Sequence, residues 1–266
     1  MSARLKTRTV EKVWGRRELP DPFSNPSGNP IGEIWFEPPP ELEQLLVKYL
    51  FTNEKLSVQC HPGDGNAPPG ERGKEECWYV LDAQLGAKLA IGLQQEVSEG
   101  HLRAAALDGS IESLLAWHEV AAGDFFYLPA GTIHAIGPGL SLIEVQQNSD
   151  ITYRLYDYGR PRELHLDAAL EVAIRAPYDA GLSRKLPETG DAVLVEGPHF
   201  RLERICGAPG TEQCERLAAR ALIIPLSGEY AVGEEPVLAG ACAWTPGMDR
   251  VAWPDDGVAL VAAPLD

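Results

Sequence analysis

The sequence predicts a mainly β protein, and two observations support this fold class. Glycine (26 residues) and proline (22 residues) are both frequent in the 266-residue chain. Between them lie short runs rich in β-branched and aromatic residues. Many short strands separated by turn residues favour a β-sandwich or a β-barrel. In chain order, the runs expected to form strands are residues 45–51, 56–60, 77–81, 125–129, 140–146, 151–158, 200–205, 221–232 and 257–263.

Two segments instead show helical periodicity. Residues 94–120 carry apolar side chains at helical spacing, and Asp108 and Gly109 interrupt the pattern, so we expect a short helical insertion there. The apolar positions are Leu102, Ala105, Ala106, Ile111, Leu114 and Leu115. Residues 163–176 predict a further helix, which should end near Pro177.

The chain should divide into two β domains. Residues 177–191 are rich in proline, glycine and charge, which is typical of a linker. We therefore predict one domain over residues 1–180, with its helical insertion at about 94–120, and a smaller β domain over residues 190–266. A similar pattern of glycines and prolines occurs in both predicted domains. Either the second domain is a degenerate copy of the first, or the pattern reflects turns that are common to any β protein.

The charge and composition of the chain limit the kinds of molecule that we expect it to bind. The formal net charge is −16 and no long basic run is present, which argues against nucleic acid and anionic membranes as partners. No segment is long and apolar enough to span a membrane, and the first residues carry no apolar signal core. We therefore expect a cytoplasmic protein. The five cysteines show no spacing typical of a disulfide scaffold.

Four separate segments contain the residue types of a divalent-metal site, and they are residues 56–62, 73–81, 123–134 and 144–157. Alternate residues of a strand face the same side, so Gln59 and His61 should point together, as should Lys74 and Glu76. With His134, this set offers two imidazoles, one carboxylate and one amide oxygen, which suits a borderline metal such as zinc. A metal with one charged protein ligand keeps positive charge, which favours a working site over a structural one.

The segment that ends at His134 has a distinctive spacing of turn residues. Gly123, Pro129 and His134 follow one another at the spacing of the second sequence motif of the cupin superfamily, which this segment resembles. Gly123 and Asp124 should open a hairpin, and the turn at residues 129–131 should aim His134 into a barrel. The resemblance implies a cupin (jelly-roll) barrel for the larger domain, and a degenerate cupin-like fold for the smaller one.

The first cupin motif usually reads His-x-His, with Glu a few residues later. Here it reads Gln59-x-His61, and a long loop rich in proline and glycine precedes Glu76. In this respect the chain resembles the zinc-dependent mannose-6-phosphate isomerases. The resemblance covers residues 10–176, and its ordered combination of motifs is far more specific than any one of them.

The resemblance also implies roles for individual residues. The family's metal ligands, which hold one zinc ion per chain, correspond to Gln59, His61, Glu76 and His134. Its active-cleft arginine corresponds to Arg154, and an acidic position that lines its site corresponds to Glu144. Lys74 and Ser57 each lie two residues before a metal ligand, and are candidates for binding the substrate phosphate.

The function that the resemblance implies is an aldose–ketose isomerase. Such an enzyme interconverts mannose 6-phosphate and fructose 6-phosphate through a cis-enediol, whose developing oxygen charge the metal and Arg154 would stabilise. The general base stays open between Glu144 and a water molecule on the metal. As structural alternatives, Arg154 would form an ion pair with Asp150 or Asp157, and Lys74 would be a solvated strand lysine.

Two other functions remain open from the sequence. One is a different metal-dependent cupin enzyme, such as a dioxygenase or a sugar-nucleotide epimerase, although Gln59 disfavours iron–oxygen chemistry. The other is a non-catalytic, sugar-phosphate-binding paralogue. We expect a monomer or a homodimer. We expect no metal ligand among the remaining histidines, which are His101, His118, His165 and His199.

Overall fold

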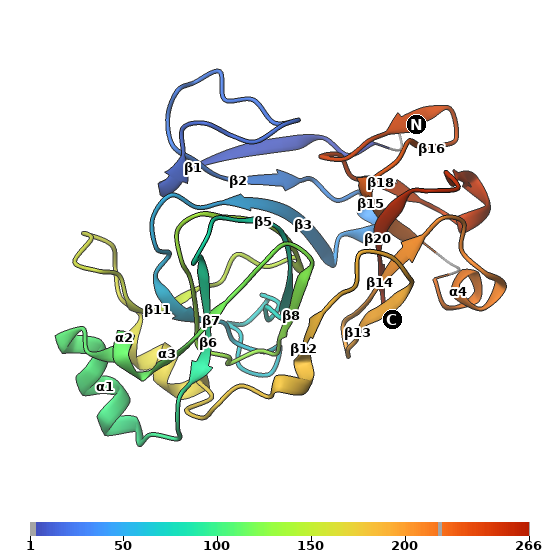
Figure 1. The fold of residues 1–266 in the computed structure, drawn as a ribbon. Helices are drawn as coiled ribbons and strands as arrows, with labels where there is room; N and C mark the ends of the chain where they lie inside the picture. Colours follow the sequence, from blue (N-terminus) through green and yellow to red (C-terminus); the bar gives the residue numbers. More distant parts are fainter. Residues whose placement is uncertain (1–3, 218–219, 266) are drawn as a thin grey trace.

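Four antiparallel sheets make up the computed structural model of the chain, which describes residues 4–217 and 220–265. The prediction of a mainly β fold is confirmed. Figure 1 shows two units, a larger one drawn from blue to yellow and a smaller one in orange and red. The figure also places the helices of the larger unit at the end that lies away from the smaller unit.

Seven strands form the first sheet. In spatial order they are β1 (Thr7–Arg16), β2 (Ile31–Phe36), β3 (Leu45–Phe51), β10 (Leu140–Gln147), β5 (Glu76–Ala83), β8 (Asp124–Leu128) and β12 (Ser183–Lys185). Five strands form the second sheet, in the order β11 (Tyr153–Tyr156), β4 (Val58–Cys60), β9 (His134–Ile136), β6 (Lys88–Leu93) and β7 (Leu115–Glu119).

These two sheets enclose one apolar core and form the barrel predicted for the larger unit. The core draws side chains from both sheets, among them Leu50, Trp78, Val80, Leu89 and Ile91. Along β5 and β10 the side chains alternate between the barrel interior and the opposite face of the sheet, as expected for strands. One face of these strands is therefore free to carry polar groups into the barrel.

The C-terminal strands form two further sheets. The third sheet has the order β13 (Ala192–Glu196), β14 (Phe200–Cys206), β20 (Val258–Pro264), β15 (Ala221–Ser227) and β18 (Ala243–Thr245). The fourth has the order β17 (Glu235–Val237), β16 (Tyr230–Val232) and β19 (Val251–Ala252). All described strands up to β12 lie in the first two sheets, and those from β13 onward lie in the other two.

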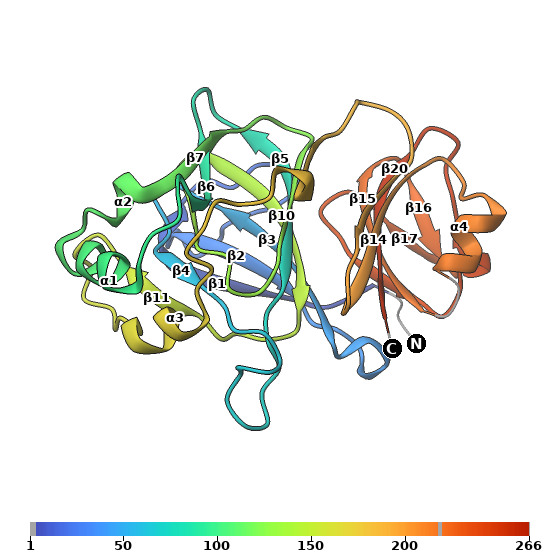
Figure 2. The same ribbon diagram turned by 90° about the horizontal axis from the view of Figure 1, so that it is seen from below.

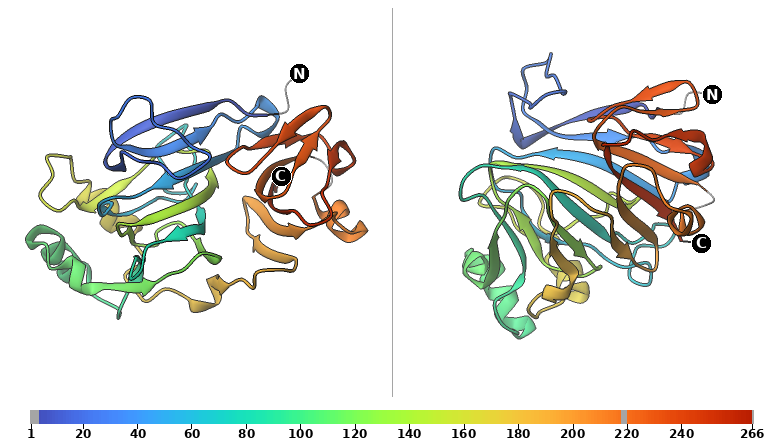
Figure 3. Two further views of the ribbon diagram at one scale, coloured as in Figure 1. Left: turned by 45° about the horizontal axis from the view of Figure 1, so that its top comes forward. Right: turned by 45° about the vertical axis from the view of Figure 1, so that its right-hand side comes forward.

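The smaller unit packs against the outer face of the first sheet. Tyr49, Ile143 and Val145 of that sheet share a buried cluster with Leu202 and Leu260 of the third sheet. Figures 2 and 3 show the two units side by side. We retain the division into residues 1–180 and 190–266, and the degenerate cupin-like copy, as proposals, because this core runs across the boundary.

The helical segments are short. They are α1 (Glu99–Asp108), α2 (Ile111–Leu114), α3 (Leu166–Val172) and α4 (Thr211–Arg216), with 3₁₀ turns η1 (Pro40–Leu42), η2 (Ala180–Leu182) and η3 (Met248–Arg250). Ser98 caps α1 by accepting a hydrogen bond from the His101 N–H. Gly109, at φ 84°, ends it.

The helical insertion is shorter than the sequence suggested. The insertion was expected at about residues 94–120 with a break at Asp108 and Gly109, yet residues 115–119 form strand β7, which pairs with β6 at the edge of the second sheet. Pairing with an open sheet edge outweighs the local helical spacing of the apolar residues there. The helix expected over residues 163–176 is likewise shorter, and spans residues 166–172. No helix in the described part of the chain has the length and apolar character needed to cross a membrane.

The shared core predicts cooperative unfolding of the two units. Leu202 is 1 % exposed, so Leu202→Ala should lower the free energy of unfolding by about 2–5 kcal/mol. The loss should appear in a single transition, because side chains of both units contact the same cluster. Denaturant unfolding followed by circular dichroism and by tryptophan fluorescence measures both quantities.

The matched control is Leu107→Ala on α1, where the leucine is 69 % exposed and the change should stay within about 0.5 kcal/mol. Two separate transitions, with only one shifted by Leu202→Ala, would contradict the shared core.

A candidate metal centre in the barrel

Three buried side chains meet inside the barrel and could together hold a metal ion. They are His61, Glu76 and His134, whose nearest ligand atoms all lie within 4.8 Å of one another. His61 Nε2 lies 3.5 Å from Glu76 Oε2, and His134 Nε2 lies 3.4 Å from Glu76 Oε1. Both imidazoles thus face opposite oxygens of one carboxylate.

Strand ends bring these side chains together. His61 directly follows β4, Glu76 opens β5 and His134 opens β9. Gln59 of β4 pairs in register with His134, which places the two sequence motifs on neighbouring strands. The turn before β9 contains Gly131 at φ 83°, and its N–H donates to the His61 carbonyl oxygen at 2.8 Å. The turn is therefore tied to the strand end that carries the first imidazole.

Both imidazoles are oriented by backbone carbonyls. His61 Nδ1 lies 2.7 Å from the Ile151 carbonyl oxygen, and His134 Nδ1 lies 2.9 Å from that of Thr132. A carbonyl only accepts hydrogen bonds, so each Nδ1 carries the proton and each Nε2 keeps its lone pair. Such contacts fix the tautomer and orientation of metal-binding histidines. Both free nitrogens point towards Glu76.

The protonation states also suit metal binding. Burial lowers the pKa of His61 well below its usual value, and the nearby Lys74 ammonium lowers it further. Burial lowers the pKa of His134 as well, against the opposing effect of Glu76. For Glu76 burial acts to raise the pKa, but the charge of Lys74 and its hydrogen bond outweigh burial and hold the pKa below its usual value. Near neutral pH the cluster therefore offers two neutral imidazoles and a carboxylate.

Gln59, the fourth expected ligand, lies at the edge of this cluster. Its Nε2 is 3.3 Å from His134 Nε2, and its Oε1 accepts a hydrogen bond from Ser57 Oγ at 2.9 Å. Rotation of the amide by 180° would turn the oxygen towards the histidines and let Nε2 donate to Ser57. The side chain can thus supply an amide oxygen without any movement of its strand.

Lys74 is part of the same cluster rather than a solvated surface residue. Its side chain is buried, and its Nζ lies 2.8 Å from Glu76 Oε2 and 3.1 Å from His61 Nε2. Burial acts to lower the pKa of Lys74, but the carboxylates of Glu76 and Glu144 raise it above its usual value. The side chain therefore carries a positive charge into the barrel.

Glu144 is held by two further groups on the same face of the first sheet. Lys48 Nζ lies 3.2 Å from its Oε1, and Trp78 Nε1 donates to its Oε2 at 3.0 Å. Lys48 and Trp78 are the direct partners of Glu144 on the neighbouring strands. Lys48 was not predicted from the sequence as part of the site. It could have been found there as the single lysine in the otherwise apolar run of residues 45–51.

Arg154 lies in β11, beside the strand that carries Gln59. It makes no ion pair within 4 Å among the described residues, and its Nε is buried without a hydrogen-bond partner. Asp157, a structural partner considered above, is instead occupied by Arg160 and by both nitrogens of the Arg162 fork. Burial, followed by the charge of Arg162, lowers the pKa of Arg154 from its usual value. The guanidinium is thus available to a ligand.

Lys74, Glu76, Glu144 and Arg154 line one cavity, whose balance of charge contrasts with that of the acidic chain around it. Five cationic and four acidic side chains line it, whereas the whole chain carries a formal net charge of −16. The charged residues are Lys12, Lys48, Lys74, Arg154 and Arg162, with Glu33, Glu76, Glu144 and Asp150. Ser57 and Gln59 line the same cavity. Four of the six histidines lie outside the cluster of His61, Glu76 and His134.

Comparison with known proteins agrees with the geometry. No protein-family model matches the chain. Over 197 residues it is 40 % identical to the mannose-6-phosphate isomerase of Streptococcus mutans. The matched region covers 70 % of this chain and 61 % of that protein. Over 200 residues it is 36 % identical to a probable mannose-6-phosphate isomerase of Bacillus subtilis. That matched region covers 72 % of this chain and 59 % of that protein. The chain spans about three fifths of the length of these relatives.

The likeness in fold extends over nearly the whole chain. A crystal structure of the mannose 6-phosphate isomerase from Bacillus subtilis superposes with a TM-score of 0.79 at 27 % identity, and 98 % of each chain is covered. The smaller unit is therefore part of the shared fold. By sequence and by fold, the chain is similar to the mannose-6-phosphate isomerases.

Proposed function

We propose that this protein is a metal-dependent aldose–ketose isomerase that interconverts mannose 6-phosphate and fructose 6-phosphate. One observation carries the proposal. Glu76, which forms the buried cluster with His61 and His134, lines the same cavity as a fixed carboxylate, Glu144, and an arginine that has no ion pair among the described residues, Arg154. Proton transfer beside a developing oxygen charge needs this combination.

The donor set supports zinc, one ion per chain. His61, Glu76 and His134 would hold it with Gln59 as the fourth ligand, because two neutral imidazoles, a carboxylate and an amide oxygen suit a borderline metal. When bound, zinc would supply a Lewis acid that stabilises negative charge on the substrate oxygens. It would compete with the Lys74 ammonium for Glu76 and for His61 Nε2, to which Lys74 is now close.

Glu144 is our proposed general base. Each of its oxygens contacts one donor, Lys48 or Trp78, and a carboxylate oxygen has two lone pairs, so each oxygen retains a site that can accept a proton. The two contacts also fix the plane of the carboxylate. A base held in this way can take the proton from C2 of the sugar and return it to C1 on the same face.

The cations of the cavity would bind the substrate and its developing charge. We assign Arg154 to the enediol oxygens, because it is a fixed charge without an ion pair among the described residues. Lys74 and Ser57 remain the proposed substrate-binding residues. Lys74 would be freed for this role when a metal replaces it beside Glu76. Arg162 lines the same cavity and adds a further positive charge for the phosphate.

The remaining parts of the proposal concern partners and location. We propose a monomer or a homodimer that acts on a small sugar phosphate, with no nucleic acid or membrane partner. Five free cysteines favour a reducing compartment such as the cytoplasm. The alternatives, another metal-dependent cupin enzyme or a non-catalytic sugar-phosphate-binding paralogue, are separated from the proposal by the assays below.

The first test is isomerisation of mannose 6-phosphate before and after removal of the metal. Activity should be lost on chelation and should return with one equivalent of zinc. His61→Ala should weaken zinc binding by more than about a hundredfold, because it removes a ligand outright. A coupled fructose 6-phosphate assay and metal analysis measure the two quantities. A fully zinc-loaded protein without turnover would exclude this substrate and favour the binding-only paralogue, whereas copurified iron would favour the other cupin enzymes.

Arg154→Ala should separate catalysis from metal binding. Loss of a fixed charge beside the enediol should lower kcat by about 10²–10³-fold. Zinc content should stay at the wild-type level, because Arg154 lies outside the cluster of His61, Glu76 and His134. Steady-state kinetics and metal analysis of the same preparation provide the comparison. Arg103→Ala on α1 is the control and should leave both unchanged. An equal loss of turnover and zinc in Arg154→Ala would mark the residue as structural.

Glu144→Gln tests the general base. The amide keeps the shape of the side chain and can still accept from Lys48 or Trp78, but it cannot take up a proton. We expect kcat to fall by about 10²–10⁴-fold with little change in zinc affinity. Exchange of the C2 proton with deuterated water should be lost in parallel. A variant that retains wild-type exchange would place the base elsewhere.

A further inference from the structure

The loop between two of the metal-binding positions is closed tightly at its neck. Residues 62–74 connect His61 to the start of β5, and the Lys74 N–H donates to the Pro62 carbonyl oxygen at 2.8 Å. The Gly73 N–H donates to Asp64 Oδ1 at 2.6 Å. A Cβ on Gly73 would lie 2.4 Å from the Asp64 nitrogen, so only glycine allows the two ends to approach this closely.

Asp64 is the residue around which this neck is organised. Besides the Gly73 N–H, its Oδ1 accepts a hydrogen bond from Gln147 Nε2 at 3.1 Å. The backbone hydrogen bond from Gly73 is the main cause that lowers the pKa of Asp64. Gln147 in turn accepts from the Glu75 N–H at 2.9 Å. The same network therefore reaches both ends of the loop that separates His61 from Glu76.

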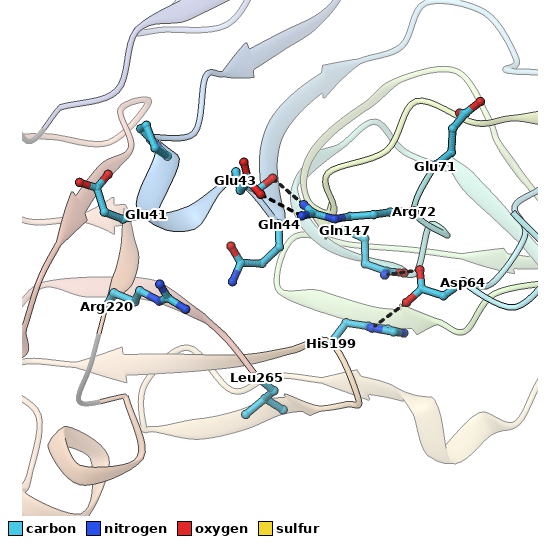
Figure 4. Close-up of a pocket in the computed structure, with 11 residues that line it drawn as sticks. Glu41, Glu43, Gln44, Asp64, Glu71, Arg72, Gln147, His199, Arg220 and Leu265 are labelled. Carbon is cyan, nitrogen blue, oxygen red and sulfur yellow. Dashed lines mark hydrogen bonds and ion pairs between the residues drawn. The ribbon is translucent and has the colours of Figure 1, made fainter. Parts of the chain in front are cut away.

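A histidine of the smaller unit contacts both ends of this neck. His199 Nδ1 lies 3.6 Å from Asp64 Oδ2, and its Nε2 lies 3.8 Å from Glu75 Oε1. Asp64 lies three residues after His61, and Glu75 lies directly before Glu76. Figure 4 shows His199 directed at Asp64, with Gln147 on the other side of that carboxylate. No function had been expected for this histidine from the sequence.

The smaller unit holds His199 firmly in place. The carbonyl oxygen of His199 accepts from the Leu265 N–H at 3.0 Å, which ties it to the end of β20. The next residue, Phe200, is buried, and its ring packs edge-on against Tyr127. The Tyr127 hydroxyl donates to Glu75 Oε2. His199 thus reaches the loop from a backbone position fixed by the core that the two units share.

On this side the loop is also held by Arg72, which donates to the Glu43 carbonyl oxygen at 3.1 Å and to Glu43 Oε1 at 3.0 Å. A cavity of about 490 Å³ separates η1 and the loop from the end of β20, and both units line it. Across this gap the larger unit presents Glu41, Glu43, Asp64 and Glu71, as Figure 4 shows. Because neighbouring side chains do not fill the gap, loss of the His199 ring would not be compensated by packing.

We propose that His199 is a positioning residue through which the smaller unit clamps the metal-binding loop. By bridging Asp64 and Glu75 it holds the two ends of the loop at the separation that lets His61 and Glu76 meet. This inference rests on the zinc site of the proposed function. Groups that orient metal ligands without contacting the metal commonly change metal affinity by about 10–100-fold. Because Asp64 is half exposed and the contacts are long, we expect a smaller effect here.

The decisive measurement is the zinc affinity of His199→Ala in the full-length protein, by competition with a chromophoric chelator. We expect affinity to fall about fivefold, while kcat of the zinc-saturated enzyme stays within about twofold of wild type. His199→Asn keeps an N–H donor near the position of Nδ1 and should recover most of the loss. His101→Ala on α1 removes an exposed imidazole far from the loop and is the matched control.

A second readout needs no metal. Amide hydrogen exchange at Gly73 and Lys74, measured in zinc-free protein, should be faster in His199→Ala than in wild type or His101→Ala, because the neck opens more often. Unchanged exchange together with unchanged zinc affinity would overturn the clamp. A wild-type protein that binds no zinc would instead overturn the proposed metal site, and faster exchange in His199→Ala would still support the clamp.

Discussion

The site depends on the interactions that compensate the buried carboxylate of Glu76. It is 1 % exposed, and a carboxylate taken so far from water must be compensated by opposite charge or by donors. Here the Lys74 ammonium lies beside one oxygen and supplies the opposite charge, whereas the unprotonated Nε2 atoms of His61 and His134 face one oxygen each without donating to it. The whole cluster follows from this need. A metal ion would satisfy the same carboxylate with two charges instead of one, and the lone pairs of both imidazoles would face it, which explains why His61, Glu76 and His134 can serve as its site.

The alternation of side chains along β5 and β10 links this site to the rest of the fold. Even-numbered residues of β10, such as Glu144, face the barrel, whereas Ile143 and Val145 face the smaller unit. The inner face of these strands can carry polar side chains because the opposite face of the same strands supplies apolar side chains that are buried against another sheet. A one-residue shift in register would exchange the two sets and abolish both the core and the site. The site and the contact between the units are therefore fixed by the same register.

The sequence was most informative where local pattern determines structure. Strand alternation placed Gln59 with His61, and the turn at residues 129–131 correctly aimed His134 inward. Prediction from the sequence failed where contacts between residues far apart in the chain determine the structure. Residues 115–119 have helical spacing but pair with β6, and no local signal reveals that edge. His199 lies more than a hundred residues from the loop it contacts, so only the packing of the two units brings them together.

The acidic character of the chain is compatible with an anionic substrate because charge acts locally. At physiological ionic strength the interaction between exposed charges is screened over about 8 Å, so most of the surface carboxylates contribute little inside the barrel. The buried cations are screened far less. Lys48 and Lys74 are each 5 % exposed or less, and Arg154 has no ion pair among the described residues. A sugar phosphate entering the cavity would therefore experience mainly the charges that line it, five cationic and four acidic side chains, and any bound metal. The net charge of −16 therefore acts mainly at the surface, while the charges of the cavity act on a group bound inside it.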